Sequence, residues 1–307
     1  MISPLFSSSP PYIEDVEYNK SLFSTKNGLF DTRGHGILRV RCKEFETPLY
    51  RFAYMPMRNR GEIIRLMLEE AEVPYEVEVI GFKDWEEGVK GTTPQGKCPV
   101  LRNYDGKGND LGQESAITRF LAGQLGLDGE SAVERAQMDS LYCLWFSTMR
   151  NNGVSHDGNE FSVAALVDAE GSKSEGRPTY QETFRINDLD KAGRSLLILD
   201  YFEEQLSKSS GPYLINAKPC YIDFGLFYIL FELSEPSNVP DFSSKFDLPL
   251  LGEFVNAVAS RPQINDYLKS ARRMPRYQRD KSGLSLYTYV EGKWSPAHRR
   301  GGEDNLG

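Results

Sequence analysis

The sequence predicts an α/β domain followed by an all-helical domain. Leu49–Tyr54 alternates apolar and polar residues as a strand does, and apolar residues then recur at helical spacing over Ile63–Leu68. After residue 125 the apolar residues repeat at helical spacing in one segment after another. These two patterns place the strands in the first half of the chain and a helical bundle in the second.

The elements of the α/β domain are predicted in the order strand, helix, strand, linker, strand, helix. A polar, Arg-rich turn, MPMRNRG, joins the first strand to its helix, and the second strand spans Tyr75–Ile80. The third strand begins after Pro99, and the last helix opens near Gln113. Tyr54 ends the first strand above the start of the first helix, where its hydroxyl can donate a hydrogen bond to a ligand. The arginines of the turn would favour negative charge on that ligand.

The helical domain is predicted from the spacing of its apolar residues. Tyr221–Leu233 is apolar nearly all round and is expected to be the buried central helix, and Pro262 occupies the first turn of the last helix. The interval 151–185 is rich in Gly, Ser, Asp and Glu, which is typical of a long loop. The other helices are expected at Ala132–Arg150, Asn187–Leu206, Leu250–Ala259 and Gln263–Ala271.

Composition limits the classes of partner and location. The 307 residues, 39% of them apolar, suffice for one or two domains with sizeable cores. The net charge of -8 argues against nucleic acid or an acidic membrane surface, and no apolar run approaches the roughly 20 residues that span a bilayer. The four cysteines are widely spaced and form no CxxC pair, which indicates reduced thiols in a cytoplasmic protein, with an organelle as the alternative. With three unclustered histidines, no metal site is expected.

Both ends of the chain are expected to lie outside the two domains. The predicted boundaries are an N-terminal extension at 1–47, the α/β domain at 48–124, the helical domain at 125–275 and a C-terminal tail at 276–307. The ends show no clear amphipathic period and mix charges with aromatic residues, which is typical of segments that become ordered on a partner. A chain cut to 47–276 is therefore expected to fold with a thermal stability close to that of the full chain.

Several motifs occur together, in a fixed order, between residues 48 and 123. They are YRFAYMPMRNRGEIIRL, an Asp-Trp pair ending at Trp85, PQGKCPVL and QESAITRFL. In this ordered set the segment resembles the thioredoxin-like domain of cytosolic glutathione transferases, nearest the sigma class, which contains prostaglandin D synthases and S-crystallins. A looser resemblance continues through 212–227 and 251–268. It implies a thioredoxin-like domain followed by an all-helical bundle (the glutathione transferase fold), with glutathione as co-substrate.

The resemblance implies that Tyr54 and Arg60 are catalytic. A thiol with a pKa of about 8.5 is mostly protonated at neutral pH, and only the thiolate is strongly nucleophilic. In the family, the tyrosine hydroxyl lowers the pKa of the glutathione thiol, and Arg60 matches an arginine that supports this pair. The alternatives are a core tyrosine at a strand end and a first-turn arginine that pairs with Glu62 or Glu114.

Other motif positions match residues that hold glutathione in the family. Pro99 matches a cis proline, whose turn exposes the backbone of the preceding residue, Cys98, to the cysteinyl unit of glutathione. The Cys98 side chain itself is expected to be a small buried apolar group rather than a redox thiol. Trp85, Lys90 and Lys97 match positions that hold the glycyl end, the lysines by charge. Each lysine could instead be a solvated surface residue.

The chain departs from the family pattern at the site for the γ-glutamyl carboxylate. In the family, a Gln-Ser pair at a helix N-terminus binds this anion with a hydroxyl and a backbone N–H. Gln113 matches the glutamine, but Glu114 falls on the serine and Ser115 lies one residue later. Two carboxylates at close range repel by about 1 kcal/mol or more. Either a shifted loop brings Ser115 to the anion, or glutathione binding is impaired.

Two further departures fall in the helical domain. The sigma-class aspartate that reaches the partner subunit's glutathione aligns with Cys143, although Asp139 is retained one turn earlier. Cys220 replaces the Ser or Thr of a capping box, which is expected to leave Asp223 alone at that helix start.

Two classes of function remain open. The first is an enzyme that uses glutathione for conjugation, isomerisation or peroxide reduction of a small apolar electrophile. Its second substrate would bind an apolar site made by Met55, Met57, Tyr142, Phe146 and Met149. The second is a non-catalytic, S-crystallin-like scaffold in a larger assembly, which the terminal extensions, the long loop, Glu114 and Cys143 favour. The family habit predicts a homodimer in either case.

Overall fold

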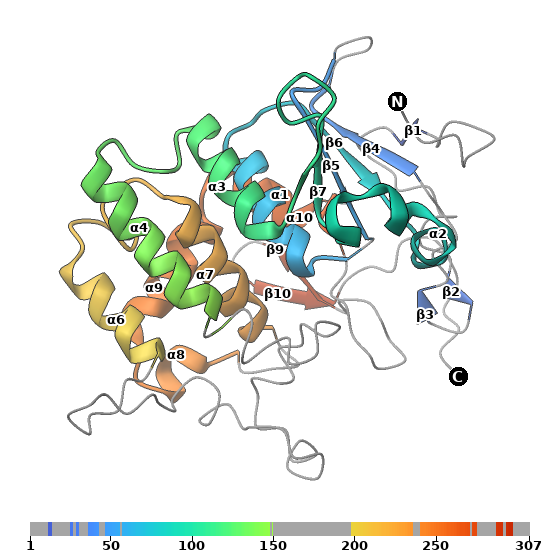
Figure 1. Cartoon of the computed structure of the whole chain (residues 1–307). Coiled ribbons are helices and arrows are strands. Elements are labelled where there is room, and N and C mark those ends of the chain that lie inside the picture. The colour runs from blue at the N-terminus through green and yellow to red at the C-terminus, as the bar shows by residue number, and fades with distance from the viewer. Residues whose placement is uncertain are drawn as a thin grey trace. The chain divides into compact units, whose positions relative to one another are not determined.

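A computed structural model describes two compact units of the chain. The described residues are 12–13, 25–26, 29–30, 36–42, 47–55, 57–147, 149, 198–235, 240–270, 272–274, 287–290 and 293–296. The first unit draws its residues from 1–121, 266–290 and 295–307, and the second from 122–265 and 291–294. Each unit is described by itself, with the labels of Figure 1.

The first unit is built on a six-stranded mixed sheet in the order β1-β4-β6-β5-β7-β8. β5 runs parallel to β6 and antiparallel to β7, which in turn is antiparallel to β8. The strands are β1 (Tyr12–Ile13), β4 (Gly36–Val40), β5 (Tyr50–Tyr54), β6 (Tyr75–Val79), β7 (Val100–Arg102) and β8 (Leu111–Gly112). The chain also contains the short strands β2 (Thr25–Lys26), β3 (Leu29–Phe30), β9 (Tyr287–Val290) and β10 (Lys293–Pro296).

Helices cover both faces of this sheet, as Figure 1 shows. α1 (Glu62–Glu70) and α3 (Glu114–Leu125) lie on one side of the strands, and α2 (Phe82–Glu87) lies on the other. β5 is therefore buried on both faces at its C-terminal end, where Phe52 and Ala53 are fully buried. A small buried core consists of Ala53, Ile80, Val89 and Val100, and Trp85 of α2 packs against it.

α1 is buried along almost its whole length although four of its nine residues are charged. Glu69 accepts hydrogen bonds from the hydroxyl of Tyr75 at 2.7 Å, from Arg41 at 2.7 Å and from Arg272 at 2.9 Å. Glu62 accepts from its neighbour Arg65 at 3.1 Å. Because a buried carboxylate is tolerated only when it is paired, α1 depends on the segments that carry these partners.

The structure differs from the boundary predicted at residue 47. β4 lies inside the range 1–47, yet it pairs antiparallel with all five residues of β6. Ile37, Leu38 and Val40 are at most 3% exposed. Without β4, the edge of β6 would present unpaired N–H and C=O groups to solvent. This strand was not predicted because its apolar residues lie in a segment of charged residues.

The boundary near residue 275 also differs from its prediction. Residues 266–274 group with the first unit rather than with the helical domain. The hydroxyl of Tyr267 donates to Glu62 at 3.0 Å, and Arg272 donates to Glu69, so this segment supplies partners for the buried charges of α1. Of the predicted tail at 276–307, the structure describes only the backbone of 287–290 and 293–296.

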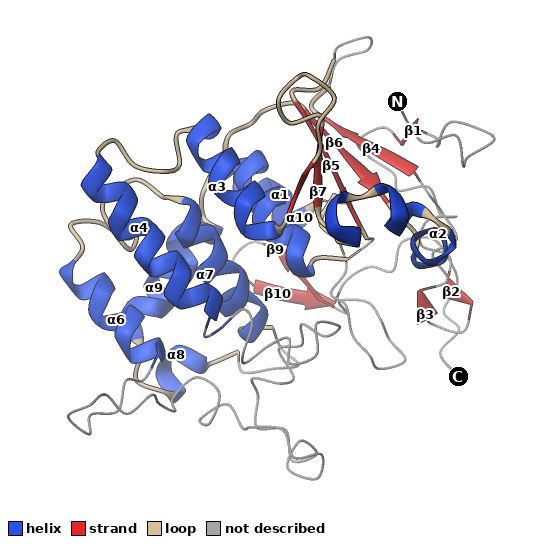
Figure 2. Cartoon of the chain, viewed as in Figure 1, coloured by secondary structure: helices blue, strands red, loops and turns tan. Residues whose placement is uncertain are grey.

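The second unit is a helical bundle (Figure 2). α4 (Ala132–Trp145) packs on α7 (Tyr221–Leu233), whose thirteen residues are all buried, as expected for the central helix. α9 (Pro249–Ala259) packs on α7, on α6 (Ile198–Lys208) and on α8 (Phe242–Lys245). α10 (Pro262–Lys269) begins with Pro262, as expected. The predicted loop at 151–185 and the first part of the predicted helix at 187–206 lie outside the described residues.

The start of α7 corrects the prediction that Asp223 stands alone. Its carboxylate accepts hydrogen bonds from the N–H of Cys220 at 2.7 Å, from the thiol of Cys220 at 3.0 Å and from the N–H of Leu214 at 3.0 Å. The prediction was wrong because a thiol can also donate a hydrogen bond. Burial raises the pKa of Asp223 to about 6, although these bonds act in the opposite direction.

Deletion of residues 1–47 is expected to destabilise the protein more than deletion of residues 1–35. The longer deletion removes β4 with its buried side chains, and it removes Arg41, a partner of Glu69. A loss of 1 kcal/mol lowers the melting temperature of a protein of this size by about 2–4 °C, so we expect a difference of roughly 5 °C or more. Thermal denaturation followed by circular dichroism measures it. Equal melting temperatures would return the domain boundary to residue 47.

Candidate functional site

Tyr54 lies at the C-terminal end of β5, where the chain enters the turn that leads to α1. Its side chain is 2% exposed. The main-chain N–H of Arg60, in the short 3₁₀ turn η2 (Asn59–Gly61), donates a hydrogen bond to the Tyr54 hydroxyl at 3.2 Å. A hydroxyl that accepts one hydrogen bond can still donate its own proton. The turn therefore holds the Tyr54 hydroxyl in one position as a donor.

Gly61 permits the close approach of the Tyr54 ring to this turn. A Cβ atom on Gly61 would lie 2.7 Å from Cδ1 and 3.2 Å from Cγ of Tyr54. Carbon atoms in packed proteins stay about 3.5–4.0 Å apart, so a larger residue at this position would displace the ring or the turn. Sequence analysis missed Gly61, because a glycine before a helix is an ordinary feature of a turn.

The guanidinium of Arg60 pairs with Glu114, the first residue of α3. Nη1 of Arg60 lies 3.4 Å from Oε2 of Glu114. Glu114 was one of the two ion-pair partners that the sequence left open for Arg60, and Glu62 instead pairs with Arg65. The Glu114 side chain is 3% exposed and that of Arg60 26%. Tyr54, Arg60 and Glu114 thus form a continuous series of polar contacts from β5 to α3.

The peptide bond between Cys98 and Pro99 is cis, as the resemblance implied. It leads into β7, and the antiparallel register pairs Val100 with Ala53. The turn therefore lies at the same end of the sheet as Tyr54. Burial raises the pKa of the Cys98 thiol to about 12, although the charges of Arg60 and Lys97 act to lower it. A thiol with such a pKa is protonated at neutral pH, which fits an inert side chain rather than a redox group.

Gln113 comes directly before α3 and adopts a left-handed backbone conformation, with φ of 72°. Its side-chain amide donates to Oε1 of Gln95 at 3.2 Å, so the start of α3 contacts the turn η4 (Pro94–Gly96). The carbonyl of Gln113 accepts from the N–H of Ile117 at 3.0 Å, and Ser115 is therefore the second residue of the helix. Sequence analysis did not foresee the contact with Gln95.

The two predicted lysines lie on neighbouring exposed turns. Lys90 belongs to η3 (Val89–Thr92), and Lys97 follows η4. The stem of Lys90 passes near Gly96, since a Cβ atom there would lie 3.8 Å from both Cγ and Cε of the lysine. Trp85 differs from the lysines, because it is half-buried and packs against the small core of the sheet.

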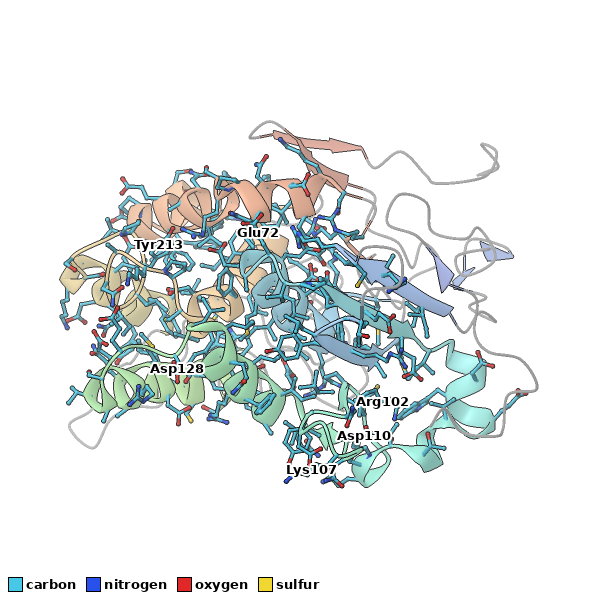
Figure 3. The ribbon with its side chains drawn as sticks, turned by 90° about the horizontal axis from the view of Figure 1, so that it is seen from above. Glu72, Arg102, Lys107, Asp110, Asp128 and Tyr213 are labelled. Carbon is cyan, nitrogen blue, oxygen red and sulfur yellow. The ribbon has the colours of Figure 1, made fainter. Side chains whose placement is uncertain are left out.

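The loop that leads from β7 to β8 is fixed by ion pairs of Arg102, which Figure 3 labels next to Asp110. Nη1 of Arg102 lies 2.8 Å from Asp110, and its Nε lies 2.9 Å from Glu78. β8 ends at Gly112, so this loop also determines where Gln113 and the start of α3 lie.

The residues predicted for the second substrate fall in both units. Met55 and Met57 belong to the first unit, and the other three belong to the second. Within the second unit, Tyr142 stacks on Phe146 with 5.9 Å between ring centroids. A joint site made by these residues therefore stays a prediction.

None of the four cysteines forms a disulfide bond, and Cys143 is exposed with its sulfur 3.9 Å from Asp139. Within the described ranges, no group of three or more His, Cys, Asp or Glu is placed to bind a metal ion. In the same ranges, no helix is long and apolar enough to cross a bilayer.

Both parts of the chain match families of known proteins. The glutathione S-transferase N-terminal domain family matches residues 61–124, and the C-terminal domain family matches residues 191–271. Glutathione S-transferase P 1 of Xenopus laevis is 27% identical over 234 residues, which cover 75% of this chain and 96% of the relative. Glutathione S-transferase 1 of Ascaris suum is 26% identical over 236 residues, covering 74% and 99%.

Solved structures agree with these matches. The crystal structure of the glutathione S-transferase from Ascaris lumbricoides has a TM-score of 0.56 and 27% identity, covering 72% of this chain and 96% of that one. The structure of prostaglandin synthase D of Nilaparvata lugens has a TM-score of 0.51 at 23% identity, covering 72% and 98%, and supports the fold alone. The chain therefore belongs to the glutathione S-transferase family, with the thioredoxin-like N-terminal domain and the helical C-terminal domain of that family.

Proposed function

We propose that this protein is a glutathione transferase in which Tyr54 stabilises the thiolate of bound glutathione. The observation that carries the proposal is the Tyr54 hydroxyl, held by the Arg60 N–H at 3.2 Å at the same end of the sheet as cis Pro99. A hydrogen bond donated to a thiolate favours the charged form and lowers the pKa of the thiol. The thiolate would then serve in conjugation, isomerisation or peroxide reduction of an apolar substrate.

Glutathione would lie along the edge formed by the turns around Pro99 and the start of α3. The backbone of Cys98 would pair with the cysteinyl unit, and Lys90 and Lys97 would attract the glycyl carboxylate. The γ-glutamyl carboxylate would meet the first turn of α3, where backbone N–H groups point out of the helix. Gln113 and Ser115 are the polar side chains that this end would offer, and Trp85 would support the glycyl end.

We place the chain nearest the sigma class, as a homodimer in the cytoplasm. The class rests on the motif around Tyr54 and Arg60, and a prostaglandin synthase is among the proteins of similar fold. The relatives also include a transferase named P 1. A non-catalytic scaffold role gains no support from the described residues, since the polar contacts of Tyr54 are in place.

Replacing Tyr54 by Phe is expected to lower turnover by about 10²-fold, because it removes a positioned donor and little else. Tyr50→Phe is the matched control, since Tyr50 lies at the other end of the same strand, and its turnover should stay near wild type. Steady-state kinetics with glutathione and a generic aromatic electrophile measure both. Equal turnover in Tyr54→Phe and wild type would remove Tyr54 from the mechanism.

Gly61→Ala is expected to lower turnover by about 10-fold or more, because the new Cβ displaces the Tyr54 ring. Gly91→Ala is the control, since a Cβ there meets nothing within 4 Å. If Gly61 acts through Tyr54, adding Gly61→Ala to Tyr54→Phe should cause little further loss. Kinetics of the four variants decide this, and fully additive losses would assign Gly61 a separate structural role.

Glu114→Ser is expected to tighten glutathione binding several-fold, since it removes a carboxylate from the γ-glutamyl end and adds a hydroxyl donor. Ser115→Ala is the companion variant. Loss of the Ser115 hydroxyl should weaken binding only if this residue, the second of α3, contacts the ligand. Calorimetric titration with glutathione measures both. No change in either variant would show that the start of α3 does not bind this anion.

A further inference from the structure

Arg60 connects the Tyr54 hydroxyl to Glu114, the carboxylate that falls on the serine of the family pattern. Its main-chain N–H contacts the Tyr54 oxygen, and its guanidinium contacts Glu114. The second contact joins residues that are 54 positions apart in the chain. Tyr54 is therefore held by a residue whose side chain is itself held by Glu114.

The burial of Glu114 makes its charge effective. Its side chain is 3% exposed, and the oxygen that faces Arg60 lies 3.4 Å from Nη1. Charges shielded from water interact more strongly than charges on the surface, because solvent and salt screen them less. The carboxylate therefore attracts the Arg60 guanidinium strongly and keeps it at the start of α3.

Other charged groups surround this pair. Lys97 lies in the turn before Cys98, and both Lys97 and Arg60 act on the Cys98 thiol. On α1, Glu62 accepts hydrogen bonds from Arg65 and Tyr267. The side chain of Glu114 contacts the Arg60 guanidinium directly.

We propose that Glu114 is a positioning residue, which holds the Arg60 guanidinium at the start of α3 and so sets how strongly its positive charge acts at the Tyr54 hydroxyl. This inference rests on the proposed function of Tyr54 and extends it. Glu114 would determine the pH at which the bound thiol ionises, in addition to any direct repulsion of the ligand carboxylate. Direct repulsion alone would change the affinity for glutathione and would not depend on Arg60.

The first test compares wild type, Glu114→Gln, Arg60→Gln and the double variant. The pH dependence of the ultraviolet absorbance of bound glutathione thiolate gives the thiol pKa in each. We expect Glu114→Gln to lower that pKa by about half a unit or more, because the Arg60 guanidinium is released from α3 and its charge can approach the thiolate. In the Arg60→Gln background, the same change should shift it by less than half as much. A shift of the same size in both backgrounds, or a change in KM with no shift, would overturn the inference.

The second test needs no glutathione and so separates this inference from the proposed function. Arg60 acts on the Cys98 thiol, so Glu114→Gln should speed alkylation of Cys98 by iodoacetamide at alkaline pH by about 3-fold, and only where Arg60 is present. Buried Cys220 is the control, because its alkylation would rise only if the variant unfolded. Mass spectrometry of the two peptides measures both rates. An unchanged rate of Cys98 alkylation would refute the coupling between Glu114 and Arg60. If the chain shows the faster alkylation but does not bind glutathione, only the proposed function is refuted.

Discussion

The burial of a charged helix is the constraint on which the first unit depends. Glu62 and Glu69 of α1 are at most 1% exposed, and a buried carboxylate without a partner would cost several kcal/mol. The partners of Glu69 come from the residue after β4, from β6 and from the segment after α10, and Arg272 lies 203 residues away in the chain. The first unit is therefore complete only when segments from both ends of the sequence are in place.

α1 also positions residues of the proposed site. The turn that begins α1 carries Arg60, whose N–H fixes the Tyr54 hydroxyl, and Gly61, which leaves room for the Tyr54 ring. The proposed role of the Tyr54 hydroxyl depends on this placement, because small displacements of a positioned group reduce its effect on a transition state.

The structure changes the interpretation of Glu114. From sequence alone, a carboxylate in the place of a serine indicates either repulsion of the ligand and impaired binding, or a shifted loop that brings Ser115 to the ligand. In the structure this carboxylate contacts the Arg60 guanidinium, so the site contains a balanced pair of charges rather than an isolated negative one. A balanced pair is compatible with anion binding, and it also connects the start of α3 to the residue that supports Tyr54.

Apolar periodicity alone predicted the order of the central strands and helices and the buried α7, because it is a local pattern that a short window contains. The cis bond before Pro99 followed from the family resemblance that the run PQGKCPVL carries. Tertiary structure decided what depends on residues far apart in the chain: the pairing of β4 with β6, the contact of Gln113 with Gln95, and the ion pair between Arg60 and Glu114. No local pattern contains these contacts, because each forms only when separate segments are brought together by packing. The sequence therefore predicts candidate residues for the site, and the fold shows which of these residues contact one another.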